Sequence, residues 1–269
     1  MTGDGVNDAP ALRQANIGVA MGITGTEVSK EAAAMVLTDD NFASIRAAVE
    51  EGRGVYDNLV KFISWTLPTN LGQGMVVLIA VAADIALPIL PGQILWINMT
   101  TAVFLGLTLA FEAKEPDVMQ RPPRDREQPI LTRRLFFRTV LVGLLLCAAA
   151  FGLYEWELTH EDSIDKARTA AVNVFMVGQA FYLLNCRSLT RSMFALGLFS
   201  NPWVWAGIAS ILVAQAAFNY LPAMNWLFHT APTGQSEWLL AATAGLVIYA
   251  VVGFEKCIAG RFRKRAESG

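Results

Sequence analysis

The sequence predicts a mixed fold, in which part of an α/β domain precedes an α-helical bundle of six membrane spans. Charged residues make up 16 % of the 269 residues and hydrophobic residues 54 %, with a mean hydropathy of +0.41. A soluble domain usually carries about a quarter charged residues, so the composition argues against an ordinary soluble enzyme and favours a multi-span membrane protein. The net charge of −2 also excludes a basic nucleic-acid-binding protein, and we expect no nucleic-acid partner.

Residues 1–61 predict a short α/β unit, because strand-like and helix-like segments alternate there. The segment is too short for a complete doubly wound domain, so its sheet must lack partner strands. A loop rich in Gly, Asp and Asn opens the chain. The elements expected after it are a helix at 9–16, a strand at 17–22, a helix at 26–33, a strand at 35–40 and an amphipathic helix at 42–61.

Residues 62–269 predict a transmembrane domain. A helix needs about 20 largely apolar residues to cross a bilayer. The fourth of the candidate segments has the weakest signal, because it carries Asn173, Gln179 and Asn185. The six expected spans are 62–83, 93–111, 137–156, 169–184, 202–221 and 237–254.

The distribution of basic residues predicts the orientation of these spans. One set of connections carries fourteen Lys and Arg, mostly within 114–138 and the tail 256–265. The opposite set carries only Lys166 and Arg168. Cytoplasmic loops are the ones enriched in Lys and Arg, so we expect both termini and the basic tail in the cytoplasm. The expected location is the cell membrane, as a multi-pass protein of a bacterial plasma membrane in contact with lipid.

The most informative motif is TGDGVNDAPAL at residues 2–12. Asp4 and Asp8 lie four residues apart, and Gly3 and Gly5 flank the first of them. Mg²⁺ prefers one or two carboxylates together with phosphate oxygens and water, and glycine allows the backbone to approach a phosphate closely. The residues alone leave two readings open, a site for phosphate and Mg²⁺ or a polar turn without a chemical role.

This motif resembles the hinge motif of the P-type ATPases, cation pumps with a haloacid-dehalogenase-like phosphorylation domain. The resemblance covers essentially the whole chain. Residues 20–63 resemble the end of that domain and the stalk into the fifth membrane helix. The run ILWINMTTAV resembles the sixth membrane helix of type II, calcium-pump-like members, and EPDVMQRPPR resembles the loop that follows it. The resemblance implies that residues 1–61 form the C-terminal part of a Rossmann-like phosphorylation domain plus the stalk, and residues 62–269 form membrane helices five to ten.

The resemblance also implies roles for the residues of the motif. Asp4 is implied to be the Mg²⁺-binding carboxylate, with Asn7 and Asp8 supporting the phosphoryl group and the metal. Thr2 and Gly3 are implied to line the same cofactor site. The family's Asp-Lys-Thr-Gly-Thr and Thr-Gly-Glu motifs do not occur in this sequence. We therefore expect a C-terminal fragment whose partner is the missing N-terminal part of the pump, which would bind most of the ATP.

Polar residues inside the expected spans indicate a transport site, since such residues are costly in a membrane and usually functional. Asn70 and Gln73 are three residues apart on one helix. Asn98 and Thr101 have the same spacing on the next helix, and Gln179 lies midway along the fourth span. Hydrogen bonding between helices is the alternative explanation.

Three of these positions depart from type II calcium pumps. By the resemblance, Gln73, Ala102 and Gln179 stand where those pumps have Glu, Asp and Glu. A divalent cation needs carboxylates to replace its hydration shell. The departures therefore argue against Ca²⁺ transport of the usual kind and leave a monovalent or an organic cation as the transported partner.

The leading hypothesis is thus a C-terminal part of an ATP-driven cation pump that contributes the Mg²⁺-binding hinge and part of the ion pathway. The alternative is a non-catalytic six-helix membrane module, or one half of a split pump. A catalytic assignment to this chain alone stays open at this point.

Overall fold

The computed structural model describes residues 1–124, 129–160, 163–189 and 193–267, with side chains up to residue 259. Part of the expected basic tail, residues 260–265, is helical, but its side chains lie outside this description. The chain divides into two compact units. The first comprises Met1–Tyr56 and Glu115–Pro122, and the second comprises Asp57–Lys114 and Pro123–Gly269.

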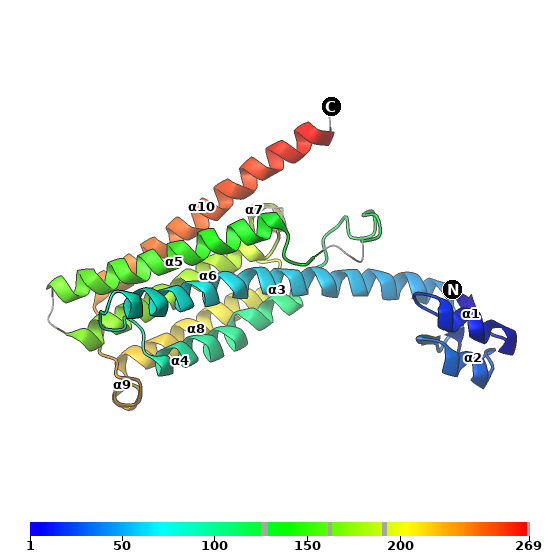
Figure 1. Ribbon diagram of the computed structural model, residues 1–269, viewed down its shortest axis with the longest axis horizontal. Helices are drawn as coiled ribbons and strands as arrows, with labels where there is room; N and C mark the ends of the chain where they lie inside the picture. Colours follow the sequence, from blue (N-terminus) through cyan, green and yellow to red (C-terminus); the bar gives the residue numbers. More distant parts are fainter. Residues whose placement is uncertain (125–128, 161–162, 190–192, 268–269) are drawn as a thin grey trace. The chain divides into compact units, whose positions relative to one another are not determined.

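The first unit contains a small three-stranded parallel sheet in the order β1-β2-β3. Figure 1 shows this part of the chain in dark blue, next to the N-terminus. Thr2 pairs with Val19, and Val19 pairs with Met35. The elements are β1 (Thr2–Gly3), the 3-10 helix η1 (Val6–Asp8), α1 (Ala9–Gln14), β2 (Val19–Met21), α2 (Glu27–Ala32) and β3 (Met35–Leu37). The described residues of this unit thus form a small sheet with two short helices, and a complete α/β domain is not evident.

Two details of this unit differ from the sequence-based expectation. The first eight residues were expected to be a loop, but they contain β1 and η1, because a two-residue strand is too short to show an alternating pattern. The strand expected at 35–40 ends at Leu37. It ends there because the chain turns at Asp40, which has a φ of 50°.

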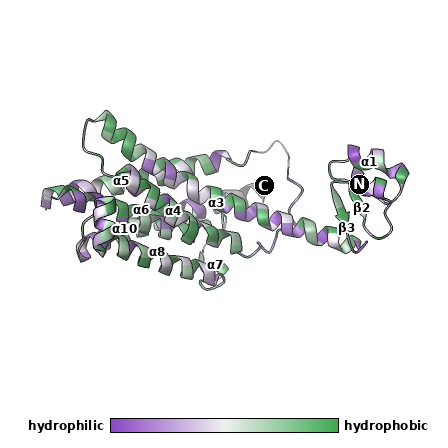
Figure 2. Cartoon of the chain, turned by 90° about the horizontal axis from the view of Figure 1, so that it is seen from below, coloured by the Kyte–Doolittle hydropathy of each residue, from purple (hydrophilic) through white to green (hydrophobic). Residues whose placement is uncertain are grey.

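The second unit is helical, and the expectation of six membrane spans is confirmed by length and composition. Within the described residues, six helices are long and apolar enough to cross a membrane. Helix α3 (Phe42–Ala82) begins in the first unit and continues into the second from Asp57. The other helices of the second unit are α4 (Pro91–Phe104) with the 3-10 segment η2 (Gly106–Phe111), α5 (Arg133–His160), α6 (Ile164–Cys186), α7 (Met193–Leu196), α8 (Pro202–Tyr220), α9 (Pro222–Phe228) and α10 (Gln235–Glu267). Figure 2 shows hydrophobic residues running along the helices of this unit, and Leu95, Val213 and Leu246 are among those exposed on their outer faces.

The helix bounds correct several expected spans. The helix expected at 42–61 and the span expected at 62–83 form one continuous helix, α3. The span expected at 93–111 changes from α-helix to 3-10 helix after Phe104. The spans expected at 137–156 and 237–254 belong to longer helices, because polar residues at both ends continue the helical turns of α5 and α10.

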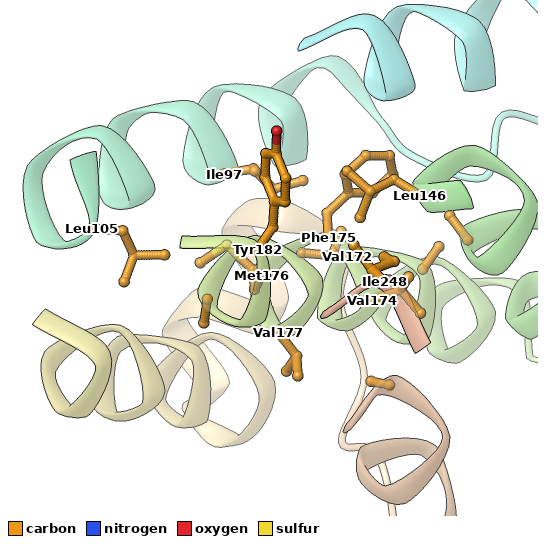
Figure 3. Packing of buried hydrophobic residues seen from close by; sticks show 14 of the residues in the cluster. Ile97, Leu105, Leu146, Val172, Val174, Phe175, Met176, Val177, Tyr182 and Ile248 are labelled. Atoms are coloured by element: carbon orange, nitrogen blue, oxygen red, sulfur yellow. The ribbon is translucent and has the colours of Figure 1, made fainter. Parts of the chain in front are cut away.

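Helix α6 lies at the centre of the second unit. In the apolar 18-residue stretch of this helix 89 % of the residues are buried, against 28–44 % in the corresponding stretches of the other five spans. Figure 3 shows Phe175, Val172 and Val177 of α6 among side chains of neighbouring helices, including Ile97, Leu146 and Ile248. The weak span signal of this helix has a physical explanation, since Asn173, Gln179 and Asn185 are all buried against protein and not against lipid.

A proline inside α3 is accommodated by a hydrogen bond from α6. Pro68 has no N–H, so the carbonyl of Ser64, four residues earlier, loses its helical donor. The hydroxyl of Tyr182 donates to that carbonyl at 2.9 Å. Trp65, the residue after Ser64, donates from Nε1 to the carbonyl of Gln179 at 3.1 Å. Gln179 lies about one turn before Tyr182 on α6. These two bonds fix α3 against α6 at the level where the candidate transport residues begin.

Candidate functional site

The loop after β1 presents Asp4 to solvent while fixing its main chain. Asp8 Oδ2 accepts hydrogen bonds from the backbone N–H groups of Asp4 and Gly5, at 3.1 and 3.0 Å. Gly3 permits this closure, because a Cβ at that position would lie 2.6 Å from the Cβ of Asp8. The Asp4 carbonyl accepts from Thr26 N and from Ser29 Oγ of α2, at 2.8 and 3.0 Å. The loop is therefore held on both sides of the Asp4 side chain.

The carboxylate of Asp4 has no hydrogen-bond or ion-pair partner in the described part of the chain, and the residue is exposed. Asn7 and Thr2 are exposed as well, and Asp8 is half-buried with one oxygen engaged by the backbone. Among the described residues, no group of three or more His, Cys, Asp or Glu could enclose a metal ion. A single accessible carboxylate fits Mg²⁺, which binds through one or two carboxylates and completes its shell with water and phosphate. It does not fit a metal held by protein ligands alone.

Asp40 is a structural residue of this sheet edge whose role is not evident from the sequence. It follows β3, and its carboxylate accepts from the backbone N–H groups of Gly22, Ile23 and Thr24 at 2.6, 2.9 and 2.8 Å. The Ile23 hydrogen bond, with those of Thr24 and Gly22, lowers the pKa of Asp40 from 3.8 to about 2. The expected strand at 35–40 included Asp39 and Asp40, whereas β3 ends at Leu37 and leaves this acidic pair in the turn beyond it, at the same sheet edge as Asp4.

The three backbone hydrogen bonds to Asp40, which we call the Asp40 clamp, predict that the stability of the fold depends on pH. Because the pKa of Asp40 is lowered in the folded state, the contribution of the clamp to stability is complete above pH about 3.8 and is lost as the pH falls toward about 2. We expect Asp40→Asn to speed amide hydrogen exchange at Gly22–Thr24 at neutral pH. The carboxyl carbon of Asp40, followed by NMR in the labelled chain, should titrate near 2. Unchanged exchange in the variant, together with titration near 3.8, would contradict the clamp.

The expected transport residues divide into buried and exposed ones. Gln73, Thr101 and Gln179 are buried, on α3, α4 and α6. Asn70 and Asn98 are exposed and have no hydrogen-bond partner in the described residues. The hydroxyl of Thr101 donates to the Ile97 carbonyl of its own helix at 2.7 Å. The structure thus places three of the five inside the bundle and two on its surface.

The side chains of Gln179 and Gln73 are buried without full hydrogen bonding. Gln179 is 1 % exposed, and neither its Oε1 nor its Nε2 has a partner within the described chain. Gln73 is 3 % exposed, and its Nε2 likewise has none. Leaving a buried polar group unsatisfied costs about 1–3 kcal/mol. The hydrogen-bonding capacity of these two amides is therefore available to something other than the neighbouring helices.

Other buried amides in the same bundle are paired. Gln215 Nε2 donates to Asn173 Oδ1 at 2.7 Å, and Asn219 Nδ2 donates to the same oxygen at 3.0 Å. Trp96 Nε1 donates to Gln215 Oε1 at 3.3 Å. Interhelical hydrogen bonding, the alternative explanation for intramembrane polar residues, thus holds for Asn173, Gln215 and Asn219, and these residues link α4, α6 and α8.

A buried ion pair joins the end of η2 to the end of α6. Arg187 donates from Nε and Nη2 to the two oxygens of Glu112, at 3.1 and 3.0 Å. Arg187 is fully buried, and the side chain of Glu112 is 2 % exposed. Asn201 Nδ2 also donates to Glu112, at 2.9 Å. No local sequence pattern predicts this pair, because its two residues lie 75 positions apart.

In the part of the chain that the structure describes, six helices are long and apolar enough to cross a membrane and enclose polar side chains, which indicates a multi-pass membrane protein. The family model described as "Cation transporting ATPase, C-terminus" matches residues 86–258. The chain therefore belongs to the C-terminal region of the P-type cation-transporting ATPases.

Several curated proteins are similar to the chain over most of its length. It is 62 % identical over 252 residues to the "Probable cation-transporting ATPase F" of Mycobacterium tuberculosis strain H37Rv, covering 94 % of this chain and 28 % of that protein. It is 45 % identical over 246 residues to the "Cation-transporting ATPase pma1" of Synechocystis, covering 89 % and 27 %. It is 38 % identical over 244 residues to the "Calcium-transporting ATPase" of Bacillus subtilis, covering 89 % and 27 %. The chain thus spans about a quarter of the length of these relatives.

Proposed function

We propose that the chain supplies two working parts of an ATP-driven cation pump, the Mg²⁺-binding hinge and one side of the transmembrane ion pathway. Residues 1–61 would be the end of a haloacid-dehalogenase-like phosphorylation domain with its stalk, and residues 62–269 would be membrane helices five to ten. The remaining part of the pump would carry the phosphorylated aspartate and most of the ATP site. Both termini would face the cytoplasm of a bacterial cell.

The hinge proposal rests on the unpaired carboxylate of Asp4 in a loop whose backbone is fixed. Phosphoryl transfer depends mainly on positioning and on neutralising charge. Mg²⁺, when bound, would supply that neutralisation. Asp4 would hold the metal, Asp8 would keep the loop closed through its bonds to Asp4 N and Gly5 N, and Asn7, Thr2 and Gly3 would border the phosphoryl group.

The ion-pathway proposal rests on Gln179, whose buried Oε1 has no partner within the described chain and can coordinate a cation. The unpaired atom of Gln73 is Nε2, an N–H donor, so Gln73 would contribute to the pathway only through its amide oxygen. An unpaired polar side chain in a membrane interior lowers stability, so its presence indicates a function such as binding a polar ligand. Asn70 and Asn98 expose further amides, which the remaining helices of the pump would cover. All of these candidate ligand groups are uncharged, so the proposed transported ion is a monovalent cation or a small organic cation. The Bacillus subtilis relative is named as a calcium transporter, so a Ca²⁺ cargo is the competing assignment.

The two classes of buried glutamine predict opposite effects on stability. Gln179→Leu removes an unpaired amide, so we expect the 269-residue chain in detergent to be as stable as the wild type, or more stable by about 1–2 kcal/mol. Gln215→Leu is the matched control, because it removes the partner of Asn173 and Trp96. We expect it to lower the free energy of unfolding by about 1–3 kcal/mol.

Transport measurements complete this test. In the intact pump, Gln179→Leu should raise the cation concentration needed for half-maximal transport, although the variant folds normally. If Gln179→Leu were as destabilising as Gln215→Leu, the amide would serve helix packing and the proposed ion site would lose its main support.

A further inference from the structure

A groove between the first turns of α5 and the last part of the α10 span belongs to neither site described above. It has a volume of about 510 Å³. Its lining residues are Arg133, Arg134, Phe137, Arg138, Leu141 and Glu255. All of them lie in the second unit, and five of the six lie on α5.

The groove carries a net positive charge. Glu255 accepts from Arg134 Nε at 2.8 Å and from Arg138 Nη2 at 2.5 Å. The lining of the groove thus holds one carboxylate and three guanidinium groups. The side chain of Arg138 is 4 % exposed and is committed to Glu255, whereas that of Arg134 is 43 % exposed. Arg133 is exposed, and its guanidinium carbon lies 5.6 Å from the centroid of the Phe137 ring. Arg133 and Arg134 can thus meet an anion without breaking the buried pair.

The walls below these arginines are apolar. Phe137 and Leu141 follow Arg133 at intervals of four residues, so they continue along one face of α5 into the membrane span. Phe137 is 58 % exposed. Arginine at the end of a span lies at the level of lipid head groups, and apolar residues one and two turns further lie at acyl-chain depth. A free phosphate ion would match the arginines but would gain nothing from the apolar wall.

We propose that this groove binds one anionic phospholipid, with its phosphate between Arg133 and Arg134 and an acyl chain along Phe137 and Leu141. Glu255 positions Arg134 and Arg138 and keeps the second of them out of contact with lipid. The site does not depend on the proposed ion pathway or on the hinge. It would anchor the start of α5 to the end of the α10 span at the surface of the bilayer.

The test counts lipids retained by the purified 269-residue chain in mild detergent, by native mass spectrometry. Phosphatidylglycerol is titrated against phosphatidylcholine of the same acyl composition. We expect one phosphatidylglycerol to bind more tightly than phosphatidylcholine, and Arg133→Gln to weaken its binding about fivefold, which corresponds to ~1 kcal/mol per basic residue. Arg46→Gln is the matched control, because Arg46 is exposed in the first unit and has no partner in the described residues. It should leave binding unchanged.

A second pair of variants tests the apolar wall. Phe137→Ala should weaken phosphatidylglycerol binding, whereas Phe136→Ala should not, since Phe136 is 51 % exposed but does not line the groove. Equal retention of the two lipids would overturn the proposal, as would equal losses in Arg133→Gln and Arg46→Gln. Displacement of the lipid by inorganic phosphate in large excess would also overturn it, because the groove would then be a phosphate site.

Discussion

Replacing Arg187 by leucine is expected to lower the free energy of unfolding of the second unit by about 3–5 kcal/mol, the usual cost of removing one partner from a buried ion pair. The guanidinium is fully buried and bonds both oxygens of Glu112. It also donates to Ser200 Oγ at 2.5 Å and to the Leu198 carbonyl at 3.2 Å. Arg187→Leu leaves the Glu112 carboxylate buried with Asn201 as its remaining side-chain donor. Unfolding by SDS in mixed micelles measures the loss.

The control and the double variant distinguish the ion pair from simple loss of volume. Arg168→Leu removes an arginine whose pair with Asp165 is partly exposed, and we expect a loss of about 1 kcal/mol or less. Arg187→Leu combined with Glu112→Leu should recover part of the stability, because no uncompensated charge stays buried. If the double variant were less stable than the wild type by the sum of the two single losses, the two residues would act independently and the ion pair would not explain the loss.

Asp4→Asn is expected to reduce ATP-dependent turnover of the intact pump by at least about a hundredfold, the order of effect of removing one electrostatic contact at a reacting centre. The substitution keeps the shape of the side chain and removes its charge. The loop should stay folded, since its bonds run through the Asp4 backbone and Asp8 Oδ2. The measurement is the amount of acid-stable phosphoenzyme and the rate of phosphate release with Mg²⁺ and ATP.

Asp39→Asn provides the matched control for this prediction. Asp39 lies in the same unit and bonds Ser44 Oγ and Asn41 N, so the change removes one negative charge without touching the Asp4 loop. Turnover should stay within about twofold of the wild type, as expected for a surface substitution away from the site. Equal losses in the two variants would show that the effect comes from net charge or folding and not from Asp4.

The number of spans was predictable because it depends on local composition, whereas the centrality of α6 was not. Asn173, Gln179 and Asn185 lowered the apparent quality of that span in the sequence. In the folded chain they make it the most buried helix, because its polar groups face protein. Hydropathy reports the average character of a segment and cannot tell which neighbour each side chain meets.

The sequence was enough to name the residues of the candidate site, but it could not predict which neighbours each of them contacts. Gln215 and Gln179 have the same side chain and similar burial, yet one is bonded and the other is not. Asp40 and the Glu112–Arg187 pair escaped notice for the same reason. Their contacts join positions 16–18 and 75 residues apart, and such pairings are fixed by tertiary structure.

The most direct test of the proposed hinge and ion pathway is ATP-driven cation uptake into sealed vesicles by the intact pump, measured for the wild type, Asp4→Asn and Gln179→Leu together. We expect uptake by the wild type, uptake and phosphoenzyme reduced by at least about a hundredfold in Asp4→Asn, and weakened uptake with normal phosphoenzyme formation in Gln179→Leu. Monovalent and organic cations should be preferred to Ca²⁺. Unchanged uptake in both variants would contradict the assignment of the hinge and the ion pathway to this chain.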